Sequence, residues 1–300
     1  MQRFIGIEAG GTKFVCVHGT NPNDLEDRVV FPTRSTEATM GDIVNYIKTV
    51  QKKHTIAAIG IASFGPVDLD VRSPNYGSIT ATPKPGWMNF NIVQALKDAF
   101  QLPVGFDTDV NAAAFAEHHW GASKGLSDCL YITVGTGIGV GAMANGQLLH
   151  GAMHPEMGHI FVPHDGVRDP FEGVCPYHHD CLEGLAAGPA MGARWQVDSA
   201  LELKEGHPAW ELEAHYLALA LANYTMCLSP ERIVMGGGVM KHRPLLDMIK
   251  PKVVEYLAGY IAHPSVLEAI DAFIVRPGLG DDSGICGALA LAGQAINNER

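Results

Sequence analysis

The sequence lacks features that define whole classes of protein. No apolar run is long enough for a membrane-spanning helix, and the opening MQRFIGIEAGG has neither the apolar stretch nor the small-residue cleavage site of a secretory signal. We therefore expect a cytoplasmic protein with no membrane partner. Basic residues are few, 21 against 32 acidic ones, so the formal charge is −11. That charge disfavours nucleic-acid binding but allows an anionic ligand, because backbone N–H groups bind phosphate inside a negative protein.

Cysteine is also scarce, with six in 300 residues. A disulfide framework is not expected in a chain of this size without an export signal. Four of the cysteines are scattered in apolar surroundings and are interpreted as buried thiols: Cys16, Cys129, Cys227 and Cys286. The other two, Cys175 and Cys181, belong to the segment CPYHHDC.

This segment places Cys175, His178 and Cys181 at intervals of three residues, and His159 lies sixteen residues before the first of them. Two cysteines and two histidines form a closed tetrahedral zinc set, with no position left for water. The segment therefore predicts a structural zinc ion that holds a loop in place. The alternatives left open are a disulfide bond between the two cysteines and ligation by another histidine: His154, His164 or His179.

Strand and helix patterns alternate along the chain, which indicates an α/β architecture. Two segments, FIGIEAGGTKFVCV and YITVGTGIGVGAM, share the order strand, Gly/Thr turn, strand, and each reads as a β-hairpin. Their separation of about half the chain suggests an internal repeat, and hence two related domains. A chance likeness of two glycine-rich hairpins is the alternative. Helical periodicity predicts helices at 40–54, 91–100, 110–123, 210–228, 243–257 and the C-terminus.

The two Gly/Thr turns have the chemistry of phosphate-binding loops. AGGTK offers the amides of Gly10 and Gly11, the hydroxyl of Thr12 and the ammonium of Lys13, and GTGIG offers Thr136 with more bare amides. Neither turn fits a Walker loop, and a strand follows where a Rossmann fingerprint has a helix. Taken singly, each is better explained as a tight hairpin turn. Together with GGGV at 236–239 they favour phosphate binding.

The segment GFDTDVN joins an expected strand to an Ala-rich helix. Asp107 or Asp109 could cap this helix, which is a common structural role. The functional alternative makes Asp109 a general base that faces a cleft. Phosphoryl transfer requires a carboxylate that takes the proton of the attacking hydroxyl, together with positive charge on the phosphates.

With these motifs in this order, the chain resembles the ROK family of sugar kinases, within the actin/hexokinase/Hsp70 superfamily, over nearly its whole length. The resemblance rests on GIEAGGTKF, GFDTDVNAAAFAE, YITVGTGIGVG, HPEMGH and CPYHHDCLEGLAAGPA. It implies an α/β fold of two actin/hexokinase-like (ribonuclease H-like) domains flanking a cleft. The first would comprise residues 1–110 and 284–300, and the second residues 111–283, including a zinc loop at 154–185.

The resemblance also implies residue roles. Asp109 would deprotonate a sugar hydroxyl, and Glu156, His159 and Glu183 would contact the sugar. Nucleotide and phosphate contacts would come from Gly10, Gly11, Thr12, Lys13, Thr136, Gly137, Pro189, Gly236, Gly237, Gly238 and Val239. The zinc ligands would be His159, Cys175, His178 and Cys181. Three positions depart from the family pattern: Glu8 replaces an Asp, Thr108 a sugar-contacting Asn, and Ala187 a Ser.

Within this family the chain is most similar to fructokinases, on its Cys-x-x-His-x-x-Cys spacing, on DTDVN, and on SITATPKPGWMNFNI. This similarity implies phosphorylation of fructose at its 6-hydroxyl with ATP and Mg²⁺, a structural Zn²⁺, and a homodimer. One alternative changes the sugar to glucose, mannose or an N-acylhexosamine. A second is a sugar-responsive regulator, although the first strand begins near residue 3 and leaves no room for a helix-turn-helix. A third is a zinc-binding module that uses no ATP.

Overall fold

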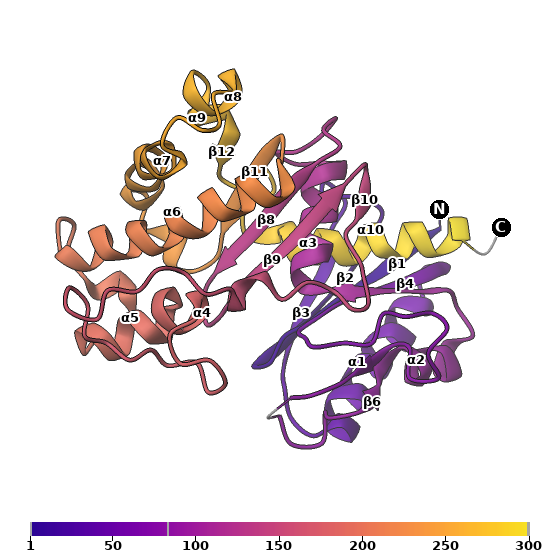
Figure 1. The fold of residues 1–300 in the computed structure, drawn as a ribbon. Coiled ribbons are helices and arrows are strands. Elements are labelled where there is room, and N and C mark those ends of the chain that lie inside the picture. Colours follow the sequence, from indigo (N-terminus) through magenta and orange to yellow (C-terminus); the bar gives the residue numbers. More distant parts are fainter. Residues whose placement is uncertain (1, 83, 299–300) are drawn as a thin grey trace. The chain divides into compact units, whose positions relative to one another are not determined.

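The computed structural model describes residues 2–82 and 84–298, and it divides into two compact units (Figure 1). Unit 1 is formed by the described residues of 1–125, 148–155 and 278–300, and unit 2 by residues 126–147 and 156–277. Residues 1, 83 and 299–300, which fall within the expected first domain, lie outside the described residues. The first unit thus continues past residue 110, where the sequence analysis placed the domain boundary.

Unit 1 is built on a five-stranded sheet in the order β3-β2-β1-β4-β7. β1 and β2 pair antiparallel across the glycine turn, with Ala9 opposite Phe14, which confirms the predicted hairpin. β4 and β7 extend the sheet in parallel. The elements of unit 1 are β1 (Arg3–Ala9), β2 (Lys13–Gly19), β3 (Glu26–Pro32), α1 (Thr36–Gln51), β4 (Ile56–Ser63), β5 (Ser78–Ile79), β6 (Phe90–Asn91), α2 (Ile92–Phe100), β7 (Val104–Thr108), α3 (Asp109–His119), η4 (Gly280–Asp282) and α10 (Ser283–Asn298).

Glycines bring α10 into close contact with the rest of unit 1. A Cβ added at Gly60 of β4 would lie 1.7 Å from the Ala288 carbonyl oxygen, so only glycine allows the helix to approach the strand this closely. At Gly287 of α10 a Cβ would lie 2.1 Å from the carbonyl oxygen of Ala112 in α3. This packing is why α3, which the sequence analysis assigned to the second domain, lies in unit 1.

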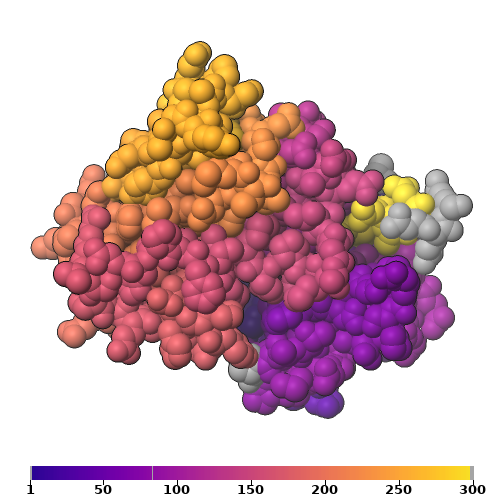
Figure 2. Space-filling view, in the orientation of Figure 1, coloured from indigo at the N-terminus to yellow at the C-terminus, as the bar shows by residue number. Residues whose placement is uncertain are grey.

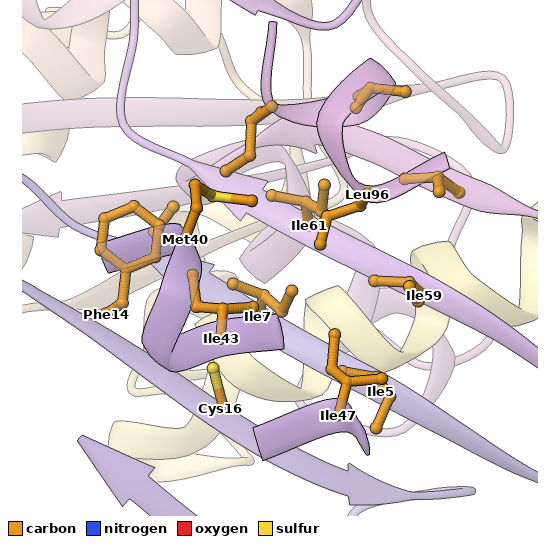
Figure 3. Close-up of a cluster of buried hydrophobic side chains, with 14 of the residues drawn as sticks. Ile5, Ile7, Phe14, Cys16, Met40, Ile43, Ile47, Ile59, Ile61 and Leu96 are labelled. Atoms are coloured by element: carbon orange, nitrogen blue, oxygen red, sulfur yellow. The ribbon is translucent and has the colours of Figure 1, made fainter. Parts of the chain in front are cut away.

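A cluster of branched and aromatic side chains fills the other face of this sheet (Figure 3). Ile5 and Ile7 of β1 alternate with residues of the opposite face, as the two-residue period of a strand requires. Met40, Ile43 and Ile47 of α1 recur at helical spacing and point toward them in Figure 3. The local sequence periodicities therefore account for the core that supports the ends of the strands.

Unit 2 repeats this arrangement with the order β10-β9-β8-β11-β12. β8 and β9 form an antiparallel hairpin, and β11 and β12 follow in parallel, so the predicted internal repeat is present in the topology. α8 and α9 project at one edge, in gold in Figures 1 and 2. The elements are β8 (Cys129–Val134), β9 (Ile138–Ala144), β10 (Gln147–Leu148), η1 (Met157–His159), α4 (Leu182–Ala186), α5 (Gly188–Trp195), η2 (Ala200–Glu202), α6 (Pro208–Leu228), β11 (Arg232–Gly236), η3 (Val239–Lys241), α7 (Pro244–Leu257), α8 (Pro264–Leu267), α9 (Ile270–Phe273) and β12 (Ile274–Val275).

The long segment between β10 and α6 carries most of the residues expected to bind sugar and zinc. Between residues 149 and 181 it contains only one short 3₁₀ helix and isolated β-bridges. Among the described helices, none has both the length and the apolar character needed to cross a membrane.

Candidate functional site

The first Gly/Thr turn joins β1 to β2 in unit 1. The Gly10 amide donates to the Lys13 carbonyl oxygen at 2.9 Å, which closes the turn, while the side chains of Thr12 and Lys13 are exposed. Glu8 lies just before the turn, and a Cβ added at Gly284 would fall 2.9 Å from its carboxylate. Burial raises the pKa of Glu8, and the nearby Lys13 cation opposes this shift. The turn thus presents a hydroxyl and a cation to solvent, as a phosphate-binding turn requires.

Asp109 is the first residue of α3, directly after the carboxyl end of β7. The helix cap is Thr108, whose hydroxyl accepts from the Asn111 amide at 3.1 Å. Capping therefore does not explain either aspartate of DTDVN. The Asp109 carboxylate accepts from the Val110 amide at 2.8 Å and is half-buried, so it remains accessible to a substrate hydroxyl.

Glu183 lies next to the second Gly/Thr turn in unit 2. Its Oε2 accepts from the Ile138 amide at 2.9 Å, and a Cβ at Gly137 would fall 2.6 Å from that oxygen. Burial raises the pKa of Glu156, and the nearby carboxylate of Glu183 raises it further. The Nε2 of His159 lies 3.9 Å from Glu183 Oε1. The structure thus brings together all three residues that the sequence analysis expected to contact sugar.

The predicted zinc ligands also meet in unit 2. The ligand atoms of His159, Cys175, His178 and Cys181 all lie within 4.8 Å of one another. His159 Nδ1 is 3.7 Å from Cys175 Sγ and 3.5 Å from Cys181 Sγ, and His178 Nδ1 is 3.8 Å from Cys175 Sγ. Tetrahedral zinc, with bonds of about 2.3 Å to sulfur and about 2.0 Å to nitrogen, separates these atoms by roughly 3.6 Å. The cluster therefore has the dimensions of a zinc site.

The structure does not support the alternative disulfide or the alternative histidine ligands of this cluster. Cys175 and Cys181 are free thiols, so the disulfide alternative is wrong. His164 contacts Asp180, at 3.2 Å between Nδ1 and Oδ2, and His154 accepts from the Val67 amide at 3.1 Å. His179 contributes only its backbone, which pairs with Cys175.

Among the described residues, one further histidine group has a spacing that could hold a metal: His18, Glu26 and His54 in unit 1. In this group the guanidinium of Arg3 occupies the place that a metal ion would take, between His18 and Glu26. Its Nε donates to His18 Nδ1 at 2.9 Å, and its Nη2 lies 3.0 Å from Glu26 Oε1. The lone pair of His18 Nδ1 is engaged by the hydrogen bond from Arg3, and the ring proton is therefore on Nε2. Neither ring nitrogen of His18 is thus available to bind a metal.

A cavity of about 520 Å³ in unit 2 brings together several of the expected nucleotide residues. Thr136, Pro189, Gly238 and Val239 line it, whereas Gly137, Gly236 and Gly237 do not. Gly135 and Gly188, which also line it, lie in the GTGIG and AGPA turns that the sequence analysis singled out, whereas the sequence did not indicate Gly192, Ala193 or residues 197–201. No basic side chain is among these lining residues, so the cavity offers a ligand mostly apolar surface and the backbone amides of its glycines.

Comparisons with known proteins agree with this geometry. The solved structure of the ROK hexokinase from Thermus thermophilus superposes with a TM-score of 0.80 at 28% identity and covers 99% of both chains. A ROK family glucokinase from Streptomyces griseus, solved with glucose and AMPPNP, has a TM-score of 0.75 at 24% identity and covers 97% of this chain and 99% of that one. The fold is therefore the actin-like two-domain fold of ROK hexokinases.

The ROK family profile matches residues 4–295, and the chain belongs to that family. It is 47% identical over 294 residues to a putative fructokinase of Bacillus subtilis, which covers 98% of this chain and 96% of that protein. It is 41% identical over 292 residues to a fructokinase of Pediococcus pentosaceus, with 97% of this chain and 98% of that protein covered.

Proposed function

We propose that the protein is an ATP-dependent hexose kinase that phosphorylates fructose to fructose 6-phosphate. The observation that carries this proposal is identity of 41–47% to proteins named fructokinases over nearly the full length. The described site agrees with it, because a half-buried carboxylate, a carboxylate–histidine group and a nucleoside-sized cavity are the parts that sugar phosphorylation requires.

Asp109 acts as the general base. Its position as the first residue of α3, directly after β7, fixes the direction of the carboxylate, and the residue is only half-buried. It takes the proton of the attacking sugar hydroxyl as the phosphoryl group is transferred. Glu156, His159 and Glu183 orient the sugar by accepting from or donating to its other hydroxyls.

The second turn and the cavity bind the nucleotide. Thr136 offers a hydroxyl, Pro189 and Val239 offer apolar surface to the base, and the glycines expose amides to the phosphates. Thr12 and Lys13 of the first turn supply a hydroxyl and a positive charge. Mg²⁺, when bound with ATP, neutralises charge on the phosphates.

The Cys/His cluster holds a structural Zn²⁺. Burial raises the pKa of the Cys181 thiol to about 11, so a thiolate there requires a cation beside it. His159 would belong both to the zinc site and to the sugar site, because its Nδ1 faces the sulfur atoms and its Nε2 faces Glu183. Zinc would thereby fix the loop that carries the sugar-binding residues.

The test is ADP release with Mg-ATP on fructose, mannose, glucose and N-acetylmannosamine. Fast turnover on fructose supports the proposal, and faster turnover on another hexose would retain the kinase and reject fructose. No turnover on any sugar would favour a sugar-responsive regulator. The same panel after zinc chelation tests the structural metal. The homodimer and the cytoplasmic location stay predictions, and light scattering tests the first.

Asp109→Asn tests the base directly. We expect kcat to fall about 100-fold or more, with the Kd for ADP unchanged. Asp98→Asn is the matched control, since Asp98 is an exposed residue of unit 1 that bonds to Gln94. Retention of more than a few per cent of activity in Asp109→Asn would refute the role of Asp109.

A further inference from the structure

Two histidines attach residues 148–155 to the carboxyl ends of two parallel strands of unit 1. His154 Nε2 accepts from the amide of Val67, four residues beyond β4, at 3.1 Å. His150 Nε2 lies 2.9 Å from Oδ2 of Asp107, which is on β7. Neither histidine belongs to the Cys/His cluster, and the family resemblance assigns a role to neither, although His154 opens the motif HPEMGH. The contact at β7 is the more informative one, because Asp109 follows that strand directly.

Asp107 connects His150 to Thr108 and Asn111, which lie on either side of Asp109 in the sequence. The carboxylate is 3% exposed, so it requires hydrogen-bond donors. Its Oδ1 accepts from the Thr108 amide and from the Asn111 side chain, each at 2.8 Å. Asp107 thus fixes the cap and the first turn of α3 around the proposed base. For Oδ2, the described structure provides His150 as the donor.

The surroundings shift the pKa values of the two histidines in opposite directions. The hydrogen bond to Asp107 raises the pKa of His150, because the carboxylate stabilises the imidazolium, and burial opposes that shift. Burial lowers the pKa of His154, whose neutral ring accepts from the Val67 amide. His150 is therefore suited to balance the charge of a buried carboxylate, and its side chain is 40% exposed, so the pair can exchange protons with solvent.

We propose that His150 is a positioning residue for phosphoryl transfer, which acts through Asp107 to hold the first turn of α3, and with it Asp109, in the reactive geometry. This inference rests on the proposed kinase function. Without His150, Oδ2 of Asp107 loses its donor and the carboxylate turns toward water. That movement breaks the hydrogen bond from the Asn111 side chain to Asp107 and loosens the first turn of α3, which carries the base. A displacement of about 1 Å at a catalytic group lowers turnover by roughly 100-fold.

The experiment compares His150→Ala and His150→Gln with the wild-type enzyme on fructose and ATP. We expect His150→Ala to lower kcat about 10- to 100-fold, with the KM for both substrates changed less than about threefold, because the base moves while the binding residues do not. Glutamine retains a donor for Asp107, so His150→Gln should recover much of the loss. His119→Ala is the control, since His119 lies at the other end of α3 and bonds to the Phe115 carbonyl.

The double variant His150→Ala/Asp107→Asn tests whether the effect passes through Asp107. We expect its kcat to be no lower than that of the worse single variant, whereas additive losses would overturn the proposal. Wild-type kcat in His150→Ala, or a loss confined to KM, would also overturn it. If the wild-type protein turned over no sugar at all, the proposed function would fail, and that result is separate from a failure of the His150 variants alone.

Discussion

Glu117 provides the sharpest test of the packing that supports the site. Its side chain is fully buried at the end of α3 and accepts four hydrogen bonds. Oε2 accepts from the amides of Ala122 and Gly278 at 2.6 and 2.9 Å, and Oε1 accepts from the Leu279 amide and the Ser283 hydroxyl at 3.0 and 2.7 Å. This carboxylate thus joins the segment after α3 to the segment that enters α10.

The magnitude follows from these donors. Glu117→Ala removes the acceptor that the partly exposed amides of Ala122, Gly278 and Leu279 share, while the Ser283 hydroxyl can turn to the Gly280 carbonyl oxygen, 3.2 Å away. Because water can reach these amides, each lost hydrogen bond should cost about 1 kcal/mol, and the free energy of unfolding should fall by about 3 kcal/mol. Glu117→Gln retains one acceptor oxygen and should lose about 2 kcal/mol.

Urea unfolding and hydrogen exchange measure this effect at two levels. The urea midpoint should fall in the order wild type, Gln, Ala, and the amides at Gly278 and Leu279 should lose protection from exchange. Glu268→Ala, at an exposed glutamate, is the control. An unchanged midpoint in Glu117→Ala, with residues 278–279 still protected, would refute the reasoning.

Three further predictions concern the site itself. Gly137→Ala should lower kcat/KM for fructose at least tenfold, because its Cβ would lie 2.6 Å from Glu183 Oε2; steady-state kinetics that match the wild type would count against this placement of Glu183. Cys181→Ser should reduce the zinc content, measured by native mass spectrometry, from one ion per chain to near zero and lower the Tm, and retained zinc would exclude this residue as a ligand. The contact between His150 and Asp107 should stabilise the folded protein fully below the ordinary histidine pKa of 6.5, and this stabilisation should be lost as the pH rises through the raised pKa of His150. His154 is the other titratable group beside the contact. Equal pH dependence of the Tm in wild type and Asp107→Asn would contradict this prediction.

Features encoded by neighbouring residues could be predicted from the sequence. The hairpin at Gly10 and the helix periodicities depend on local patterns, and the structure has both. The Cys/His cluster could be predicted for the same reason, since Cys175, His178 and Cys181 lie within one short segment and have few ways to face one another.

Features that depend on distant contacts could not be predicted. His150 and Asp107 are 43 residues apart, and no pattern in either segment points to the other. Residues 197–201, which line the cavity, have no regular periodicity, so the sequence did not predict that they form part of its wall. The assignment of α3 to unit 1 depends on the contact between Gly287 and Ala112, which only the three-dimensional packing defines.

The repeated strand order shows where the two halves of the molecule differ. In unit 1, residues 33–35 alone connect the edge strand β3 to α1, whereas residues 149–207 separate the edge strand β10 from α6. The Cys/His cluster, α4 and α5 all lie within that one longer connection. A gene duplication followed by a single insertion would account for the difference. Changes within the insertion would then leave intact the duplicated frame that carries Asp109 and the two Gly/Thr turns.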